Sequence, residues 1–286
     1  MLDNRGMDSK VFFEHYPQRK EDSNKYDNGV LALIAGSYGM AGAAAFNLIG
    51  ARSVGASYIH CFLPASIYPI VAANELSAVY HPYDENNDSV FEETELKKIK
   101  AIGIGSGIDN LPHKEKYLKD VLKNNMAPII VDAGALSVLA GNEEFYAFNN
   151  NMILTPHLGE FSKLVHRSSK DILSNKEEIA VNFALKHHVI LVLKGHETLI
   201  INEEGKISYN HSGNSALARA GSGDVLTGMI SGLCSLYEDP YTAVKDAVWL
   251  HGHLADEALA SHSKEIFDLR LYPELADRFF LKHQIA

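Results

Sequence analysis

Short apolar runs alternate along this chain with longer stretches of helical periodicity, and this alternation limits the fold more than any other feature. Each run is continuously apolar, which is typical of strands that are buried on both faces of a sheet. Strand followed by helix, repeated along the chain, predicts an α/β fold with a central, mainly parallel sheet and helices on both faces. The expected strands cover residues 30–36, 58–64, 101–107, 127–136, 151–157 and 188–195.

Other parts of the chain do not follow this alternation. Residues 197–211 predict a β-hairpin with its turn at Glu204-Gly205, and the chain from Val225 onward is mostly helical in period. Residues 1–25 are polar and predict an N-terminal arm or loop. Because no linker, low-complexity tract or repeat interrupts the sequence, we expect a single domain over residues 1–286.

Charge limits the possible partners, and cysteine content and apolar runs indicate the compartment. The formal charge of −10 argues against nucleic acid and anionic membranes, which both attract clustered lysine and arginine. Cys61 and Cys234 lie in separate apolar segments, as expected for free thiols in a reducing compartment. No apolar run has the length of a signal peptide core or a membrane span. We therefore expect a cytoplasmic protein.

Polar residues and glycines follow the expected strands where each one ends. The carboxyl ends of parallel strands meet at one edge of an open sheet, and ligands bind there. The sequence thus predicts one site at this edge, built from Gly36-Ser37, Gly103 to Gly107, Asp132, Thr155 to Glu160 and Lys194 to Thr198.

Two common nucleotide-binding fingerprints are missing from the sequence. Gly205-Lys206 is followed by Ile207 and lies in the hairpin, so it is no Walker A loop. A dinucleotide fingerprint needs GxGxxG, whereas Gly103, Gly105 and Gly107 give GxGxG and no helix-opening glycine follows in register. Neither a P-loop NTPase nor a Rossmann dehydrogenase is supported. No Ser-His-Asp constellation or HExxH motif is present either.

The segment "RAGSGDVLTGM" (219–229) carries more information. The backbone N–H groups around Gly221 and Gly223 can approach an anion closely, and the helix that starts there points its positive end at the same place. Asp224 could take a proton from an attacking hydroxyl group at this position. It could equally be an ordinary acid at a helix start. The segment alone leaves both interpretations open.

Two further segments offer candidate residues, each with a structural alternative. Lys194 and Gly195 end a strand, where they could hold phosphates or simply be solvated. His157 and Glu160 stand three residues apart at the start of a helix. Glu160 could organise water around Mg²⁺, or it could only favour the helix start, and a histidine by itself is more often structural.

Taken together, the ordered strings "GSYGMAGAA", "GIGSG", "VDAGAL", "LTPHLGEF", "VLKGHET", "GNSALARAGSGDVLTG" and "LHGHLAD" resemble one known family. The chain is similar over nearly its whole length to the ADP- or ATP-dependent NAD(P)H-hydrate dehydratases of the ribokinase-like superfamily. The resemblance implies a ribokinase-like fold and the repair of hydrated NADH or NADPH (NADHX and NADPHX). In this reaction the ring hydroxyl is phosphorylated by ADP or ATP, and loss of phosphate restores the ring double bond.

The resemblance also implies roles for individual residues. Asp224 would be the catalytic base, and the amides around Gly221 and Gly223 would stabilise the transferring group. Glu160 would act through Mg²⁺. The nucleotide would contact Lys194, Gly195, His196, Glu197, Thr198, Asn214 and Gly223, and the hydrated dinucleotide would contact Ala43, Gly105, Gly107, His157 and Asp224.

His157 stands where other members of the family have asparagine, and in this the chain resembles the bacterial branch that uses ADP. The family's habit implies a homo-oligomer, such as a homotetramer. We also expect a functional link to an NAD(P)H-hydrate epimerase that is a separate protein, because the chain has no room for an epimerase domain.

Two alternatives remain at this stage. A small-molecule kinase of the same superfamily, acting on a vitamin precursor or a sugar, would use the same base and anion site but stop at the phosphate ester. A catalytically silent nucleotide-binding protein would keep the fold and use Asp224 only as a helix-start acid.

Overall fold

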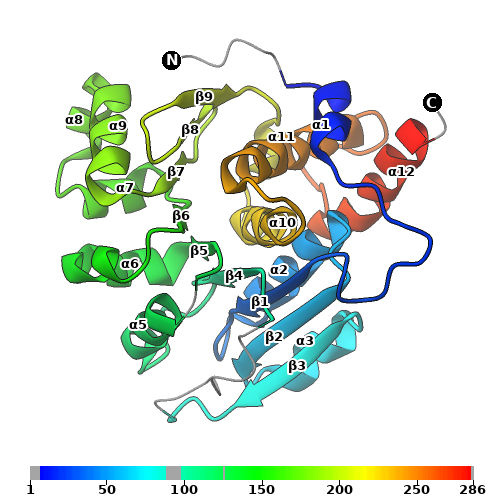
Figure 1. Ribbon diagram of the computed structural model, residues 1–286, viewed down its shortest axis with the longest axis horizontal. Helices are drawn as coiled ribbons and strands as arrows, with labels where there is room; N and C mark the ends of the chain where they lie inside the picture. Colours follow the sequence, from blue (N-terminus) through cyan, green and yellow to red (C-terminus); the bar gives the residue numbers. More distant parts are fainter. Residues whose placement is uncertain (1–6, 88–97, 125, 285–286) are drawn as a thin grey trace.

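The computed structural model describes residues 7–87, 98–124 and 126–284, and the strands of these residues form one nine-stranded sheet (Figure 1). The strand order is β3-β2-β1-β4-β5-β6-β7-β8-β9, parallel from β3 to β7 and antiparallel for β8 and β9. The prediction of a mainly parallel sheet is confirmed, as is the hairpin. The strands are β1 (Val30–Ile34), β2 (Tyr58–Pro64), β3 (Ala78–Tyr83), β4 (Ala101–Ile104), β5 (Ile129–Val131), β6 (Met152–Leu154), β7 (Ile190–Leu193), β8 (Thr198–Ile201) and β9 (Ile207–Asn210).

Helices cover both faces of the sheet, as expected. One face carries α2, α10, α11 and α12, and the other carries α5, α6, α7 and α9 (Figure 1). No helix of the described residues is both long and apolar enough to cross a membrane. The α-helices are α1 (Ser9–His15), α2 (Ala41–Ser53), α3 (Tyr68–Asn74), α5 (Lys114–Asn124), α6 (Ala133–Gly141), α7 (Leu158–Leu164), α8 (Ser169–Ser174), α9 (Lys176–His187), α10 (Ser222–Leu236), α11 (Pro240–Ala258) and α12 (Tyr272–Gln284), and the short 3₁₀ helices are η1 (Glu143–Phe148), η2 (Ser215–Leu217) and η3 (Leu269–Leu271).

The continuous apolar runs divide their side chains between two hydrophobic cores. In β1, Leu31 and Leu33 point into the core beneath α2 and α10, while Ala32 and Ile34 point into the core on the opposite face. All four are fully buried. Successive side chains of a strand alternate between the faces of a sheet, so a strand covered on both sides is apolar at every position.

Within residues 1–25, for which the sequence predicts an arm or loop, the structure has the helix α1. Asp8 caps this helix by accepting a hydrogen bond from the Val11 amide at 2.9 Å. Phe12 is fully buried, with its ring 5.9 Å from that of Trp249 and 5.6 Å from that of Phe279. The short apolar stretch around Phe12 does not by itself predict this contact, because Trp249 and Phe279 belong to α11 and α12, beside which α1 lies in Figure 1.

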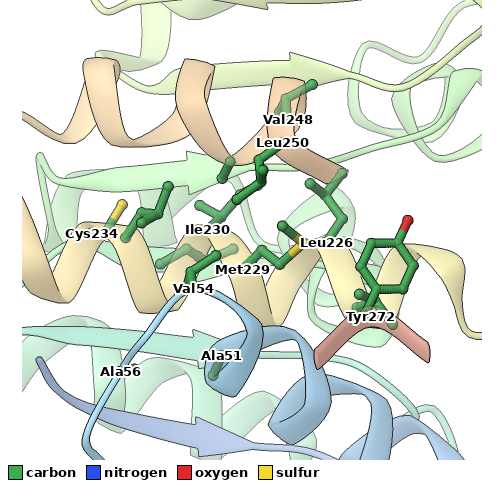
Figure 2. Packing of buried hydrophobic residues seen from close by; sticks show 14 of the residues in the cluster. Ala51, Val54, Ala56, Leu226, Met229, Ile230, Cys234, Val248, Leu250 and Tyr272 are labelled. Carbon is green, nitrogen blue, oxygen red and sulfur yellow. The ribbon is translucent and has the colours of Figure 1, made fainter. Parts of the chain in front are cut away.

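Helices α2 and α10 pack so closely that glycine is required where they meet. A Cβ atom on Gly50 would lie well within 3.0 Å of the Val225 backbone, and one on Gly228 equally close to the Asn47 backbone. Figure 2 shows Leu226, Met229 and Ile230 of α10 between residues of α2 and residues of α11. This packing fixes the first turn of α10 relative to α2 and to the edge of the sheet.

Candidate active site

The carboxyl ends of β1, β4, β5, β6 and β7 meet at one edge of the sheet, together with the first turn of α10. The Ser37 hydroxyl donates to the Gly107 carbonyl at 2.7 Å, which joins the ends of β1 and β4. The Lys194 amide donates to the Pro156 carbonyl at 2.9 Å, which joins the ends of β7 and β6. The strand-end residues predicted to converge therefore do so.

Asp132 lies at the centre of this edge, directly after β5, with 2% of its surface exposed. One carboxylate oxygen accepts hydrogen bonds from the Lys194 ammonium at 2.9 Å and from the Thr155 hydroxyl at 2.8 Å. The other accepts from the Thr227 hydroxyl of α10 at 2.9 Å. A buried carboxylate is stable only when it is paired and hydrogen-bonded, and three donors supply this here.

Lys194 ends β7 and lies close to the start of α10. Its ammonium would be 3.5 Å from a Cβ atom built on Gly223. Burial opposes its charge, but the carboxylates of Asp132, Glu160 and Asp224 outweigh that effect and raise the pKa of Lys194 above its usual value. The site therefore holds a permanent cation beside the helix N-terminus.

Asp224 lies in the first turn of α10, half-buried, at the same edge. Burial and the nearby charge of Asp132 raise its pKa to about 6, against the opposing effects of a Ser106 hydrogen bond and of Lys194. The carboxylate is thus mostly ionised at neutral pH but binds a proton more tightly than an exposed aspartate. A carboxylate with these properties is suited to be a general base.

The first turn of α10 has no side-chain cap. Its N-cap residue, Gly221, is left-handed with φ 93°, and a Cβ atom there would lie 2.5 Å from the Phe46 ring. Only glycine fits both constraints. The uncapped amides at this helix start, with the Lys194 ammonium beside them, form an arrangement that attracts phosphate.

Asn47 of α2 holds the base in place. Its side-chain amide donates to the Ser106 hydroxyl at 2.9 Å and to the Asp224 backbone carbonyl at 2.9 Å. Its buried Oδ1 accepts no hydrogen bond within the described part of the chain. Sequence reasoning placed Ser106 at this edge, within Gly103 to Gly107, but it missed Asn47 and Thr227. A polar residue among the small apolar residues of "AAAFNLIGA" was the available signal for Asn47.

The glycines that follow β4 let the backbone come close to its neighbours. Gly105 has φ 130°, and a Cβ atom there would overlap the Asp132 carbonyl. Gly107 has φ 70°, and a Cβ atom there would lie 2.7 Å from that of Ala43. Close packing explains all three residues, and their contact with a dinucleotide stays a prediction.

His157 and Glu160 form a capping box at the start of α7. His157 Nδ1 accepts hydrogen bonds from the amides of Gly159 and Glu160 at 3.0 and 3.2 Å, and Glu160 Oε2 accepts from the His157 amide at 2.8 Å. The histidine side chain is 61% exposed, whereas that of Glu160 is 14% exposed. Both residues therefore stabilise the start of α7, and their contacts with a ligand stay predictions.

The remaining nucleotide candidates lie in a turn and a loop. After Lys194, Gly195, His196 and Glu197 form an exposed turn that closes when the Thr198 hydroxyl donates to the Gly195 carbonyl at 3.3 Å. The side chain of Asn214 instead supports the fold. It accepts from the Ala216 amide at 2.9 Å and donates to the Ala255 carbonyl and to Asp256 at 3.0 and 2.8 Å.

Two curated bacterial proteins are similar to this chain. It is 33% identical to the ADP-dependent (S)-NAD(P)H-hydrate dehydratase of Bacillus subtilis, over 86% of this chain and 87% of that protein. It is also 33% identical to the bifunctional NAD(P)H-hydrate repair enzyme Nnr of Gloeobacter violaceus, over 90% of this chain. The match covers 52% of that second protein, so the chain spans about half the length of this bifunctional relative.

Solved structures and a family model agree with this similarity. The B. subtilis ADP/ATP-dependent NAD(P)H-hydrate dehydratase, co-crystallised with ATP and Mg²⁺, superposes with a TM-score of 0.83 at 28% identity, over 96% of this chain and 97% of that one. A ribokinase-like superfamily protein of Enterococcus faecalis shares the fold, with a TM-score of 0.83 at 21% identity over 96% and 95% of the two chains. The family model described as NAD(P)H-hydrate dehydratase matches residues 31–274. The chain, with its ribokinase-like fold, therefore belongs to the NAD(P)H-hydrate dehydratase family.

Proposed function

We propose that this protein dehydrates the S-epimer of hydrated NADH or NADPH in a reaction that consumes ADP or ATP. One observation carries the proposal: Asp224, a carboxylate of raised pKa, lies beside Lys194 and an uncapped helix N-terminus. A base and an anion-binding site meet at one place. The similarity to the ADP-dependent (S)-NAD(P)H-hydrate dehydratase of B. subtilis supports both the substrate and the use of ADP.

In the proposed mechanism the oxygen of the ring hydroxyl attacks the terminal phosphorus of the nucleotide, and Asp224 takes the hydroxyl proton. An O–P bond forms, and the bond to the leaving phosphate of the nucleotide breaks. The ring C–O bond then breaks, phosphate leaves with the bonding electrons, and the neighbouring ring carbon loses a proton. The ring double bond is restored. Phosphorylation is needed because hydroxide is a much poorer leaving group than phosphate.

The transferring phosphoryl group would be stabilised by two features of this chain. The amides at the start of α10, around Gly221 and Gly223, would donate hydrogen bonds to its oxygens. The Lys194 ammonium would neutralise charge on the phosphates of the nucleotide, and the turn from Gly195 to Thr198 would hold the rest of that molecule.

The residues at this edge fit a magnesium ion bound through water. Mg²⁺ usually keeps several waters and takes one or two carboxylates together with substrate phosphates. Glu160 offers one such carboxylate, largely buried and close enough to Lys194 to raise its pKa. When bound, the ion would neutralise charge on the phosphate oxygens.

The setting of the enzyme follows from the same proposal. Cys61 and Cys234 are both buried free thiols, which fits a reducing cytoplasm. A functional link to an NAD(P)H-hydrate epimerase, which would supply the S-epimer, stays part of the proposal. A homo-oligomer, such as a homotetramer, remains a prediction from the resemblance.

The deciding experiment supplies hydrated NADH with ADP or with ATP and follows the absorbance of reduced nicotinamide. We expect the absorbance to recover with at least one of the two nucleotides. A protein that fails with both, yet phosphorylates a hydroxymethyl-pyrimidine or a hydroxyethyl-thiazole, is a kinase of the superfamily and the proposal is wrong.

Activity should depend on pH through Asp224, whose pKa is raised to about 6. The base must be ionised to accept a proton, so the rate should be full above this value and decline as the pH falls through it. Below pH 6 we expect kcat/KM, which reports the pKa of a base in the free enzyme, to fall about tenfold per pH unit. A pH–rate profile between pH 4.5 and 8 measures this decline. A flat profile through pH 5 would mean that another group is the base.

A further inference from the structure

We propose that Asp132 is a positioning residue, which binds the Lys194 ammonium and thereby keeps it from pairing with Asp224. The inference builds on the proposed function, in which Asp224 must remain an available base. It explains how the Lys194 ammonium can bind the phosphates of the nucleotide without also forming an ion pair with the Asp224 carboxylate.

The side chain of Asp132 does not cap the helix that follows it. It occupies the N-cap position of α6, where an aspartate usually accepts hydrogen bonds from the first helical amides, but it makes no such bond. A capping side chain stabilises a helix because it satisfies one of the first backbone amides. Asp132 forgoes this contact and accepts from Lys194, Thr155 and Thr227 instead.

The backbone around Asp132 is strained in a way that supports this direction. The next residue, Ala133, has φ 45°, a left-handed conformation that alanine rarely adopts. The carbonyl of Asp132 lies so close to Gly105 that no side chain fits there. Such strain is concentrated at functional sites. Here it accompanies the turn of the Asp132 carboxylate toward Lys194.

The charges at this edge explain why such a restraint is needed. Lys194 interacts with three carboxylates, Asp132, Glu160 and Asp224, and hydrogen-bonds Asp132 at 2.9 Å. His251 of α11 also faces Lys194, but burial lowers the pKa of its ring to about 4, so it is neutral. Without Asp132, the ammonium would be drawn to Asp224. An ion pair there would lower the proton affinity of the base.

The test is the Asp132→Asn variant, which removes the charge and keeps the shape. We expect the acid limb of the pH–rate profile to move to lower pH by about one unit, because Asp224 loses a negative neighbour and gains a closer cation. We expect kcat to fall about tenfold, since a less basic carboxylate is a weaker base, while KM changes less. Asp246→Asn is the matched control, a buried acid of α11 that binds His15 and Tyr237. It should leave the acid limb in place.

A second measurement does not depend on catalysis. The ¹³Cγ signal of Asp224, assigned by its loss in Asp224→Asn, reports its pKa directly. This pKa should fall in Asp132→Asn and rise in Lys194→Met, and the double variant should lie between the two. Because the double variant removes both buried charges, it offers a folded protein even if Asp132→Asn alone does not fold.

The outcomes separate the two proposals. If the wild-type protein fails to dehydrate hydrated NADH but the ¹³C titrations shift as expected, the proposed function is wrong and the role of Asp132 stands. If wild type is active but Asp132→Asn is folded with an unchanged acid limb and an unchanged Asp224 titration, Asp132 only supports the fold. Unchanged Asp224 titrations in Lys194→Met and in the double variant overturn the inference equally.

Discussion

Replacing Asp224 by asparagine is expected to lower kcat for dehydration about a thousandfold or more, while nucleotide affinity changes little. Asparagine has nearly the same shape and can occupy the same helix turn, but it cannot accept the proton of the ring hydroxyl. Losses of this size are typical when a general base is removed. Recovery of reduced-nicotinamide absorbance measures kcat, and isothermal titration calorimetry with the nucleotide measures binding.

Asp239→Asn is the matched control for this experiment. Asp239 is an acid at a helix start, like Asp224, but it only caps α11, through the amides of Tyr241 and Thr242. Asparagine caps helices about as well as aspartate, so this variant should keep full activity. If Asp224→Asn retains activity within tenfold of wild type, Asp224 is also only a helix-start acid, and the protein acts by another mechanism or is a silent binding protein.

Gly228→Ala is expected to destabilise the protein by about 3 kcal/mol or more, because the added methyl group has no space. Its Cβ would overlap the backbone of Asn47, so α2 and α10 would have to separate. Overpacking of a rigid core typically costs 1–3 kcal/mol and sometimes more. Because Asn47 also holds Asp224, activity should fall along with stability. Urea unfolding followed by circular dichroism measures the free energy of unfolding.

Gly141→Ala provides the comparison for this prediction. Gly141 is also helical, in the last turn of α6, but a Cβ atom there meets no atom within 4 Å. Alanine should therefore leave stability unchanged or raise it by up to about 1 kcal/mol. Equal effects of the two substitutions would show that helix propensity, and not the close approach of α2 and α10, determines the result at Gly228.

The sheet and its functional edge could be predicted from the sequence because both depend on local patterns. A continuous apolar run such as that of β1 reports burial on both faces, and the residue after each strand is placed at the edge by topology alone. β3 was not predicted. Among the described residues it lies at the end of the sheet and pairs with β2 alone, and it is mostly half-exposed, so its sequence "AVYHPY" lacks a continuous apolar run.

The contacts inside the site could not be predicted in the same way. Asp132 reaches Lys194 across 62 positions of sequence and Thr227 across 95. As an acid directly before a helix, Asp132 has the same local sequence signature as a capping residue, so only the tertiary structure reveals its different partners. The reverse holds for Asn214, which the resemblance assigns to the nucleotide and which the structure shows bound to Ala216, Ala255 and Asp256.

The docking of α1 sets an order for folding during synthesis. His15 binds Asp246 across 231 positions, and Phe12 packs on Phe279 near the far end of the described chain. A ribosome releases α1 first, so the partners that it finds in α11 and α12 are missing until those helices have also emerged. Contacts of such sequence separation form late and slowly. We therefore expect the packing of Phe12 on α11 and α12 to be among the last steps of folding.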